Sequence, residues 1–516
     1  MKLKTLTTAV LLSLPTAGAF AAALDRSGQS ISAFLQPNNY FEAGISILDP
    51  TVEGVESGNS VTKRPISDMA DDYYFPSAAL KLQPTKNFSF GLIYDQPFGA
   101  SAEYSGNNVF VSSPQDTILG QTQLAGIRAS QIASNVNQVL PVQLQQNLQP
   151  AIAGEVNRQA QTMIQSGAVP AGTPIAMVVA GIRANAEAMQ KIETGVTQAI
   201  TSQVTQAVAQ QVDAGLAKVN GLLGKGVTKV DVDTQNLSMI FGFQPNENWN
   251  IYGGAAYQTI KGSVNLRGQA YSLYNGYDAS IPEDSAVGWL AGAAFQIPEI
   301  ALKASLTYRS EIDHKVDVEE NIPTLPALAL LGQSALAQQI ATSSGRTEIT
   351  TPQSVNLDFQ TGIMANTVAF ANVRWVEWSK FSIQPHKFGQ VSQAVGPLVQ
   401  KPGGFNLVQY EDDQISATVG VGRKINDQWA GNVSVGWDSG AGNPITTLGP
   451  TEGFWNVGLG VQYSPTPATF IAGGVKYFML GDADAQTAAQ SGGNQYVASF
   501  EDNDAWAYGL KMGYKF

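Results

Sequence analysis

Residues 504–516, DAWAYGLKMGYKF, decide the fold of this chain. Every second side chain in this segment is large and apolar, and the side chains between them are mostly small or polar. The apolar series is Trp506, Tyr508, Leu510, Met512, Tyr514 and Phe516. A period of two residues places the two series on opposite faces of a β-strand. Because aromatic residues stand at both ends of the apolar face, we predict a strand that crosses a bilayer between two aromatic girdles.

The same alternation recurs along most of the chain, and short turns alternate with long connections between the alternating segments. The alternation is clearest near 41–47, 287–295, 302–308, 355–363, 415–421 and 455–463. The short turns are 84–87, 245–248, 298–299, 365–366, 426–427 and 465–467. We therefore predict an all-β transmembrane barrel of about 14 antiparallel strands. A soluble β-sandwich would show shorter strands and no side preference in loop length.

The N-terminus indicates export. Lys2 and Lys4 precede an apolar run, and Ala19-Phe20-Ala21 fits a small-x-small cleavage site, so residues 1–21 are predicted to be a secretory signal peptide. Residues 22–38 lack strong alternation and are expected to fold inward as a small hatch or plug, with the barrel at 39–516. An even strand number places both termini on the periplasmic side of a bacterial outer membrane.

A long insert interrupts the barrel pattern. No Phe, Tyr or Trp occurs at 111–240, although the chain holds 21, 17 and 8 of them. Apolar residues recur every three or four positions from Met189 to Leu223, which indicates one face of a long helix. Shorter helical pieces are expected upstream of Pro170 and Pro174. We interpret residues 113–227 as a helical extracellular loop whose apolar stripe packs helix on helix, or in part gathers apolar ligand or contacts a partner.

Composition disfavours several classes of function. The net charge of −12 argues against a nucleic-acid partner, and the absence of Cys excludes disulfides and thiol chemistry. With only His314 and His386, and no nucleotide-loop, zinc-protease or serine-hydrolase motif, the chain is not expected to be an enzyme and needs no cofactor. The run Glu311-Ile312-Asp313-His314 is more simply a solvated charge run than a metal site.

Several segments resemble the FadL-type long-chain fatty-acid and hydrocarbon transporters. They are LTYRSE at 306–311, TPQSVNL at 351–357, VRWVEWS at 373–379, NDQW at 426–429 and GWD at 436–438. The resemblance covers nearly all of 25–516 outside the insert. It implies a monomeric barrel plugged by an N-terminal hatch, with substrate captured on helical extracellular loops, bound inside and released sideways through the wall.

The resemblance also suggests binding residues. By its place in the motif order, Lys261 looks like the family's pocket cation, and Arg309 and Arg374 are the other candidates for a lumen cation that neutralises a carboxylate. For each, the alternative is a structural ion pair lining the lumen. The sequence departs from the family in carrying QPNN at 36–39 instead of the Asn-Pro-Ala motif of the hatch, and in the length of its insert.

These observations lead to three functional hypotheses. The first is passive uptake of long-chain fatty acids or related hydrophobic compounds by a protein that contacts outer-membrane lipid. The second is a non-specific porin for small polar solutes, and the third is adhesion or phage contact through the helical insert. The terminal Phe516 resembles the signal by which the barrel-assembly machinery recognises its substrates.

Overall fold

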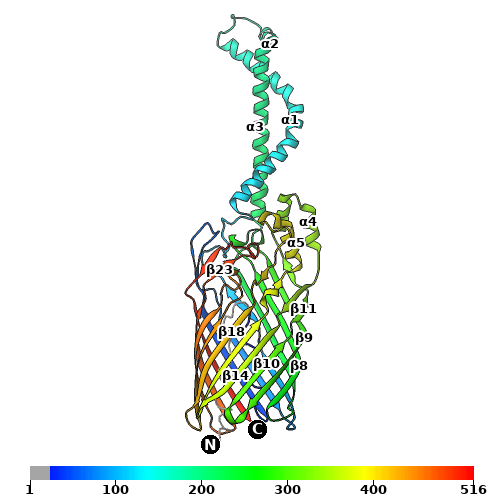
Figure 1. Ribbon diagram of the computed structural model, residues 1–516. Helices are drawn as coiled ribbons and strands as arrows, with labels where there is room; N and C mark the ends of the chain where they lie inside the picture. Colours follow the sequence, from blue (N-terminus) through cyan, green and yellow to red (C-terminus); the bar gives the residue numbers. More distant parts are fainter. Residues whose placement is uncertain (1–23) are drawn as a thin grey trace. The chain divides into compact units, whose positions relative to one another are not determined.

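The computed structural model describes residues 24–516 and shows a closed barrel of 14 antiparallel strands (Figure 1). Each strand pairs with its neighbour in the chain, and β1 with β25 completes the ring. The strands are β1 (Tyr40–Thr51), β4 (Tyr73–Leu82), β5 (Phe88–Asp95), β7 (Lys229–Phe243), β8 (Trp249–Asn265), β9 (Asp278–Ile297), β10 (Leu302–Arg309), β14 (Ser354–Met364), β15 (Thr367–Val376), β18 (Gln414–Lys424), β19 (Trp429–Asp438), β21 (Phe454–Tyr463), β22 (Thr469–Leu480) and β25 (Asp504–Lys515). The predicted fold class is confirmed, while the predicted signal peptide lies outside the described residues.

The two-residue period sets which side chains face lipid. In β25, Trp506 and Leu510 are 42% and 51% exposed, whereas Ala505 and Ala507, on either side of Trp506, are buried. The exposed row is apolar because it meets hydrocarbon, and the buried row is small because it meets the filled lumen. Among the described residues, no helix is long and apolar enough to cross a membrane.

The six short turns join strands at one end of the barrel, as predicted, and the long connections at the other end form small elements of their own. Five short strands make a separate sheet in the order β20-β23-β24-β2-β3. The smaller strands are β2 (Gly54–Glu56), β3 (Pro65–Ile66), β6 (Gly99–Glu103), β11 (Ile312–Val316), β12 (Glu319–Asn321), β13 (Thr347–Thr351), β16 (Ser382–Ile383), β17 (Val408–Gln409), β20 (Ile445–Thr446), β23 (Ala483–Gln486) and β24 (Ala498–Phe500), and the helices are α4 (Ser334–Thr342) and α5 (His386–Val395).

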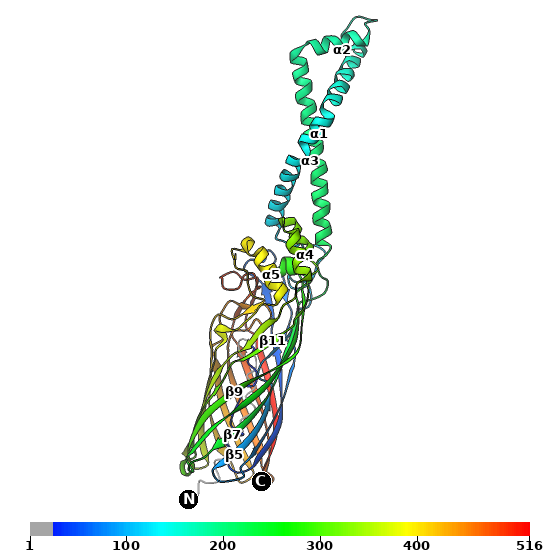
Figure 2. The same ribbon diagram turned by 90° about the vertical axis from the view of Figure 1, so that its right-hand side faces the viewer.

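A helical unit comprises 117–223 and 326–335. Its main helices are α1 (Gln121–Gln165), α2 (Ile175–Ala184) and α3 (Ala186–Asn220), and Figure 2 shows α2 joining the two long helices. The stripe of α3 is buried at Ile200, Val204 and Val208 against residues of α1, as the helix-on-helix interpretation predicts. The expectation of shorter pieces upstream was wrong.

Helix α1 continues through Pro141 and Pro150. Each proline removes one helical hydrogen bond. Leu140, Leu144 and Leu148 nevertheless pack against the stripe of α3, so tertiary contact sustains the helix across both prolines.

The connection between β19 and β21 contains a half-buried carboxylate, Glu452, with a pH-dependent contribution to stability. Glu452 accepts hydrogen bonds from the backbone N–H groups of Ala441 and Gly442, at 3.3 and 3.0 Å. Burial raises the pKa of Glu452 to about 7 in spite of these bonds, with a smaller contribution from the negative charge of Asp412. Folding therefore favours the protonated form of this side chain.

We expect the stability contributed by Glu452 to be fully present below its unfolded pKa of about 4.5 and to be lost as pH rises to about 7. The free energy of unfolding should fall by at most about 3 kcal/mol over this pH range, because a rise of the pKa from 4.5 to about 7 is equivalent to that energy. The Tm of Glu452→Gln should depend less on pH between 5 and 8 than the Tm of the wild type. Glu283→Gln, at an exposed position, serves as control. Equal pH dependence in the wild type and Glu452→Gln would contradict the prediction.

Candidate functional site

The N-terminal segment 24–38 lies against the inner face of the barrel wall. Ile31 and Phe34 pack with Tyr252 and Leu290 of the wall in one buried cluster. The wall also binds the segment through polar side chains. Asn356 donates to the carbonyl of Gly28 at 2.7 Å, Lys303 donates to that of Leu35 at 2.8 Å, and Lys81 donates to that of Gln36. These contacts hold the segment in the lumen at several points.

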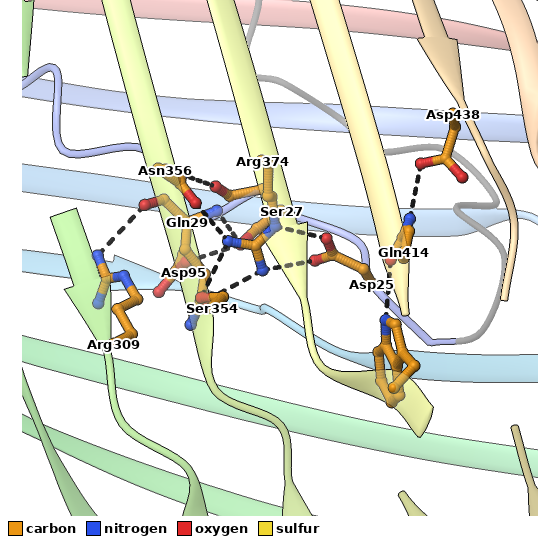
Figure 3. A network of polar contacts seen from close by, with 12 residues as sticks. Asp25, Ser27, Gln29, Asp95, Arg309, Ser354, Asn356, Arg374, Gln414 and Asp438 are labelled. Atoms are coloured by element: carbon orange, nitrogen blue, oxygen red, sulfur yellow. Dashed lines mark hydrogen bonds and ion pairs between the residues drawn. The ribbon is translucent and has the colours of Figure 1, made fainter. Parts of the chain in front are cut away.

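Arg374, one of the predicted binding residues, is the centre of a buried polar network (Figure 3). Its guanidinium donates to Asp25 at 2.6 and 3.2 Å and to the side-chain oxygen of Asn356 at 2.7 Å. The side chains of Arg374 and Asp25 are only 3% and 4% exposed. In this structure the charge of Arg374 is therefore compensated by the N-terminal segment, and it ties that segment to β15.

Arg309 joins the same region from β10. It donates to the hydroxyl of Ser238 at 3.1 Å and to the carbonyl of Gln29 at 3.2 Å. Gln29 also accepts a hydrogen bond from Arg374 through its side-chain oxygen, at 3.1 Å. The structure thus brings Arg309 and Arg374 together around one residue of the N-terminal segment (Figure 3).

Lys261, the third predicted binding residue, lies elsewhere. It is near the C-terminal end of β8, opposite Asp233 of β7 in the ladder. Its side chain is exposed. The register of the pairing between β8 and β9 shifts between Ile260 and Gly262, so Lys261 lies at an irregularity of the ladder. Lys261 does not line the cavity that Arg374 borders.

This cavity lies between the N-terminal segment and strands β10 to β22, and it holds about 140 Å³ of free space. Its apolar side chains include Phe370, Phe454 and Phe478, and its charged side chains are Asp25, Lys303, Asp358, Arg374, Asp438 and Lys476. A mixed lining of this kind suits an amphipathic molecule, because the apolar part and the polar head each meet a matching surface.

Most charges in the cavity already have partners. Asp358 accepts hydrogen bonds from Ser305 and Asn372, and Asp438 accepts from Gln414 and the backbone of Gly440. Lys303 is bound to the N-terminal segment, as described above.

Lys476 differs from these groups. Its side chain is 7% exposed, yet it has neither a hydrogen bond nor an ion pair within residues 24–516. Sequence reasoning missed Lys476. The two-residue alternation of β22 could have identified it, because Lys476 lies on the same face of the strand as the inward-facing Phe470, Ala472 and Phe478.

A second cavity lies where the barrel wall is incomplete. Strand β4 pairs with β1 from Tyr73 to Lys81, but with β5 only over Ala78–Leu82. The chain then bends after β5, and β6 continues the pairing with β7. Residues of the N-terminal segment, of β1, of β4 and of β5 line the cavity at this position. The wall therefore lacks a continuous ladder between β4 and the bend.

The N-terminal segment covers this gap from the inside. Arg26 N–H donates to the carbonyl of Pro97 at 2.7 Å, and the N–H of Gly99 donates to that of Leu24 at 2.9 Å. The Arg26 guanidinium lies 4.1 Å from the centre of the Tyr73 ring and 5.7 Å from that of Phe75. A cation over aromatic faces is a favourable contact, so Arg26 stabilises the closed arrangement.

Comparisons with known proteins agree with this architecture. The profile of the family described as outer membrane protein transport protein (OMPP1/FadL/TodX) matches residues 176–516. A crystal structure of a Pseudomonas aeruginosa FadL homologue superimposes with a TM-score of 0.56 at 12% identity, covering 98% of this chain and 99% of that chain. At this identity the likeness shows the fold alone.

The P. putida toluene transporter TodX is similar over 94% of this chain and 91% of its own, at 9% identity and a TM-score of 0.47. No curated protein sequence matches the chain. The family match covers more than half of the sequence, and the family consists of transport proteins rather than enzymes. The chain therefore belongs to the OMPP1/FadL/TodX family of outer-membrane proteins that transport hydrophobic compounds.

Proposed function

We propose that this protein takes up long-chain fatty acids or closely related amphipathic compounds by passive transport. The observation that carries the proposal is Lys476, a cation without a partner among the described residues, in a cavity that it shares with Phe370, Phe454 and Phe478. An ammonium group satisfies a carboxylate by a charge-assisted hydrogen bond. Each methylene of the tail that leaves water contributes roughly 0.8 kcal/mol.

The route that we propose begins at the extracellular connections and ends at the wall gap. Residues 22–38 act as the hatch, and the substrate leaves sideways between β4 and the bend after β5. The protein acts as a monomer, residues 1–21 direct export, both termini face the periplasm, and Phe516 serves assembly of the barrel. The position of Arg26 beneath the gap supports a gating role for the N-terminal segment.

Uptake in cells tests the function directly. A strain lacking this protein should take up less radiolabelled oleate than the wild type, and a plasmid copy should restore uptake. Unchanged uptake of both fatty acids and hydrocarbons would overturn the proposal. Large, steady conductance in planar bilayers would favour the porin hypothesis. Loss of surface binding, with intact uptake, after removal of 113–227 would favour the adhesion hypothesis.

Arg26→Ala tests the proposed exit. Removal of the guanidinium takes away its contacts with Tyr73 and Phe75, which are worth about 1 to 2 kcal/mol. We expect uptake of a hydrophobic fluorescent dye by intact cells to rise several-fold, because the closed arrangement becomes less populated. Arg346→Ala, which removes an exposed guanidinium from a connection, should leave uptake unchanged. Equal uptake by Arg26→Ala and the wild type would exclude Arg26 as a gate.

A further inference from the structure

The outer wall of the barrel has a shallow, widely open apolar hollow over β18, β19, β21 and β22. The side chains around it are mostly aliphatic. They include Val421, Val433, Leu459, Val461 and Val475. These residues belong to the outward row of their strands, so the hollow opens toward membrane lipid and is separate from the lumen.

Two glycines of the outward rows, Gly431 and Gly473, are among the residues that line the hollow. In the ladder Gly431 lies opposite Val461, and Val461 lies opposite Gly473. A methyl group built on Gly431 or Gly473 would come no closer than 3.5 or 3.6 Å to another atom, which is ordinary contact. The protein therefore has room for a side chain at both positions.

Glycines on the inward face of the same strands, in contrast, have no room for a side chain. A methyl group on Gly420 would lie 2.3 Å from the Phe370 ring, and one on Gly436 would lie 2.4 Å from Asn456. Packing inside the protein thus requires those glycines but does not require Gly431 and Gly473. Glycine in the interior of a strand is unfavourable and often marks a position where a ligand approaches the backbone closely. The two outward glycines therefore indicate that a molecule outside the protein lies against the wall at this position.

Arg423, a cation, lies at the rim of the hollow. Arg423 lies opposite Gly431 in the ladder, one residue before the end of β18. Its side chain is exposed and has no ion pair within the described part of the chain, while the neighbouring Lys424 binds Asp427 at 2.8 Å. Trp429 and Tyr463, whose ring centres are 4.8 Å apart, mark the lipid headgroup level at this end.

We infer that the hollow is a binding site for one phospholipid of the leaflet on the side of the short turns. An acyl chain lies over Gly431 and Gly473, and the phosphate meets the Arg423 guanidinium. Charge complementarity supports this occupant, because the only charged group that lines the hollow in the described part of the chain is a cation, Arg423, at headgroup height. A second barrel is a poorer fit, since a stable protein interface needs roughly 20 to 30 residues on each side.

Native mass spectrometry of the full-length protein, delipidated in detergent and titrated with long-chain phosphatidylglycerol, tests the site. We expect one tightly bound lipid per barrel. Arg423→Gln should raise the dissociation constant about tenfold by removing the charged contact. Gly473→Leu should raise it by a similar factor, because the new side chain occupies the place of the acyl chain. The heat-dependent shift in gel mobility verifies that each barrel is folded.

Two variants serve as matched controls. Val435→Leu enlarges an outward side chain beside the hollow, and Lys86→Gln removes an exposed cation in another short turn. Both should bind phosphatidylglycerol as the wild type does. The inference is overturned if the wild type retains no tight phospholipid, or if Arg423→Gln and Gly473→Leu bind it with unchanged affinity. It is also overturned if lipid A, rather than phospholipid, is the ligand whose affinity these variants lower.

Discussion

Replacement of Arg374 by methionine is expected to destabilise the attachment of the N-terminal segment by about 3 to 5 kcal/mol. The change leaves Asp25 buried without its ion-pair partner, which lies 2.6 Å away in the wild type. A buried carboxylate that loses its cation is strongly destabilising, because no water replaces the lost contact. The segment should therefore leave the wall in a measurable fraction of molecules.

Single-channel recording and hydrogen exchange measure this effect. Arg374→Met should open brief conductance events that the wild type lacks, and amides of residues 25–36 should exchange faster. The double variant Asp25→Leu/Arg374→Met should recover part of the protection, since an apolar pair carries no buried charge. Lys424→Gln, which breaks an ion pair with the fully exposed Asp427, should have little effect. Unchanged exchange at 25–36 in Arg374→Met would show that the ion pair does not hold the segment.

Replacement of Lys476 by glutamine is expected to weaken binding of a long-chain fatty acid at least tenfold. The ammonium has no partner of its own among residues 24–516, so a bound carboxylate would be its first charged contact. Hydrogen bonds between charged groups contribute about 1.5 to 3 kcal/mol, which corresponds to roughly 10- to 150-fold in affinity. Isothermal titration of the purified barrel with oleate measures the change.

The choice of ligand and control separates this role from a general loss of structure. A neutral hydrocarbon should bind Lys476→Gln and the wild type equally, because it has no carboxylate. Lys261→Gln alters the cation that the family resemblance suggests, but this side chain is exposed and outside the cavity, so we expect little change in affinity. A larger loss in Lys261→Gln than in Lys476→Gln would assign the carboxylate to Lys261 and refute the cavity site.

Individual elements show how far sequence reasoning reaches. The alternation in residues 504–516 correctly predicts β25, and the six short turns correctly predict the strand count. Arg309 and Arg374 are predicted as lumen cations and do face the N-terminal segment. The continuity of α1 was not predictable in the same way, because the penalty of Pro141 and Pro150 is local while the compensating contacts come from α3.

The amino-acid sequence by itself determined the barrel, because a strand that separates lipid from a filled lumen must alternate its side chains, and this period is readable along the chain. Only the tertiary structure decided which of the cations bordering the cavity have partners and which of them, Lys476, has none among residues 24–516. Asp25 and Arg374 are 349 positions apart, so no local pattern links them. Lys476 has the same inward parity as its apolar neighbours in β22, and its lack of a partner among the described residues depends on strands that meet only when the barrel closes.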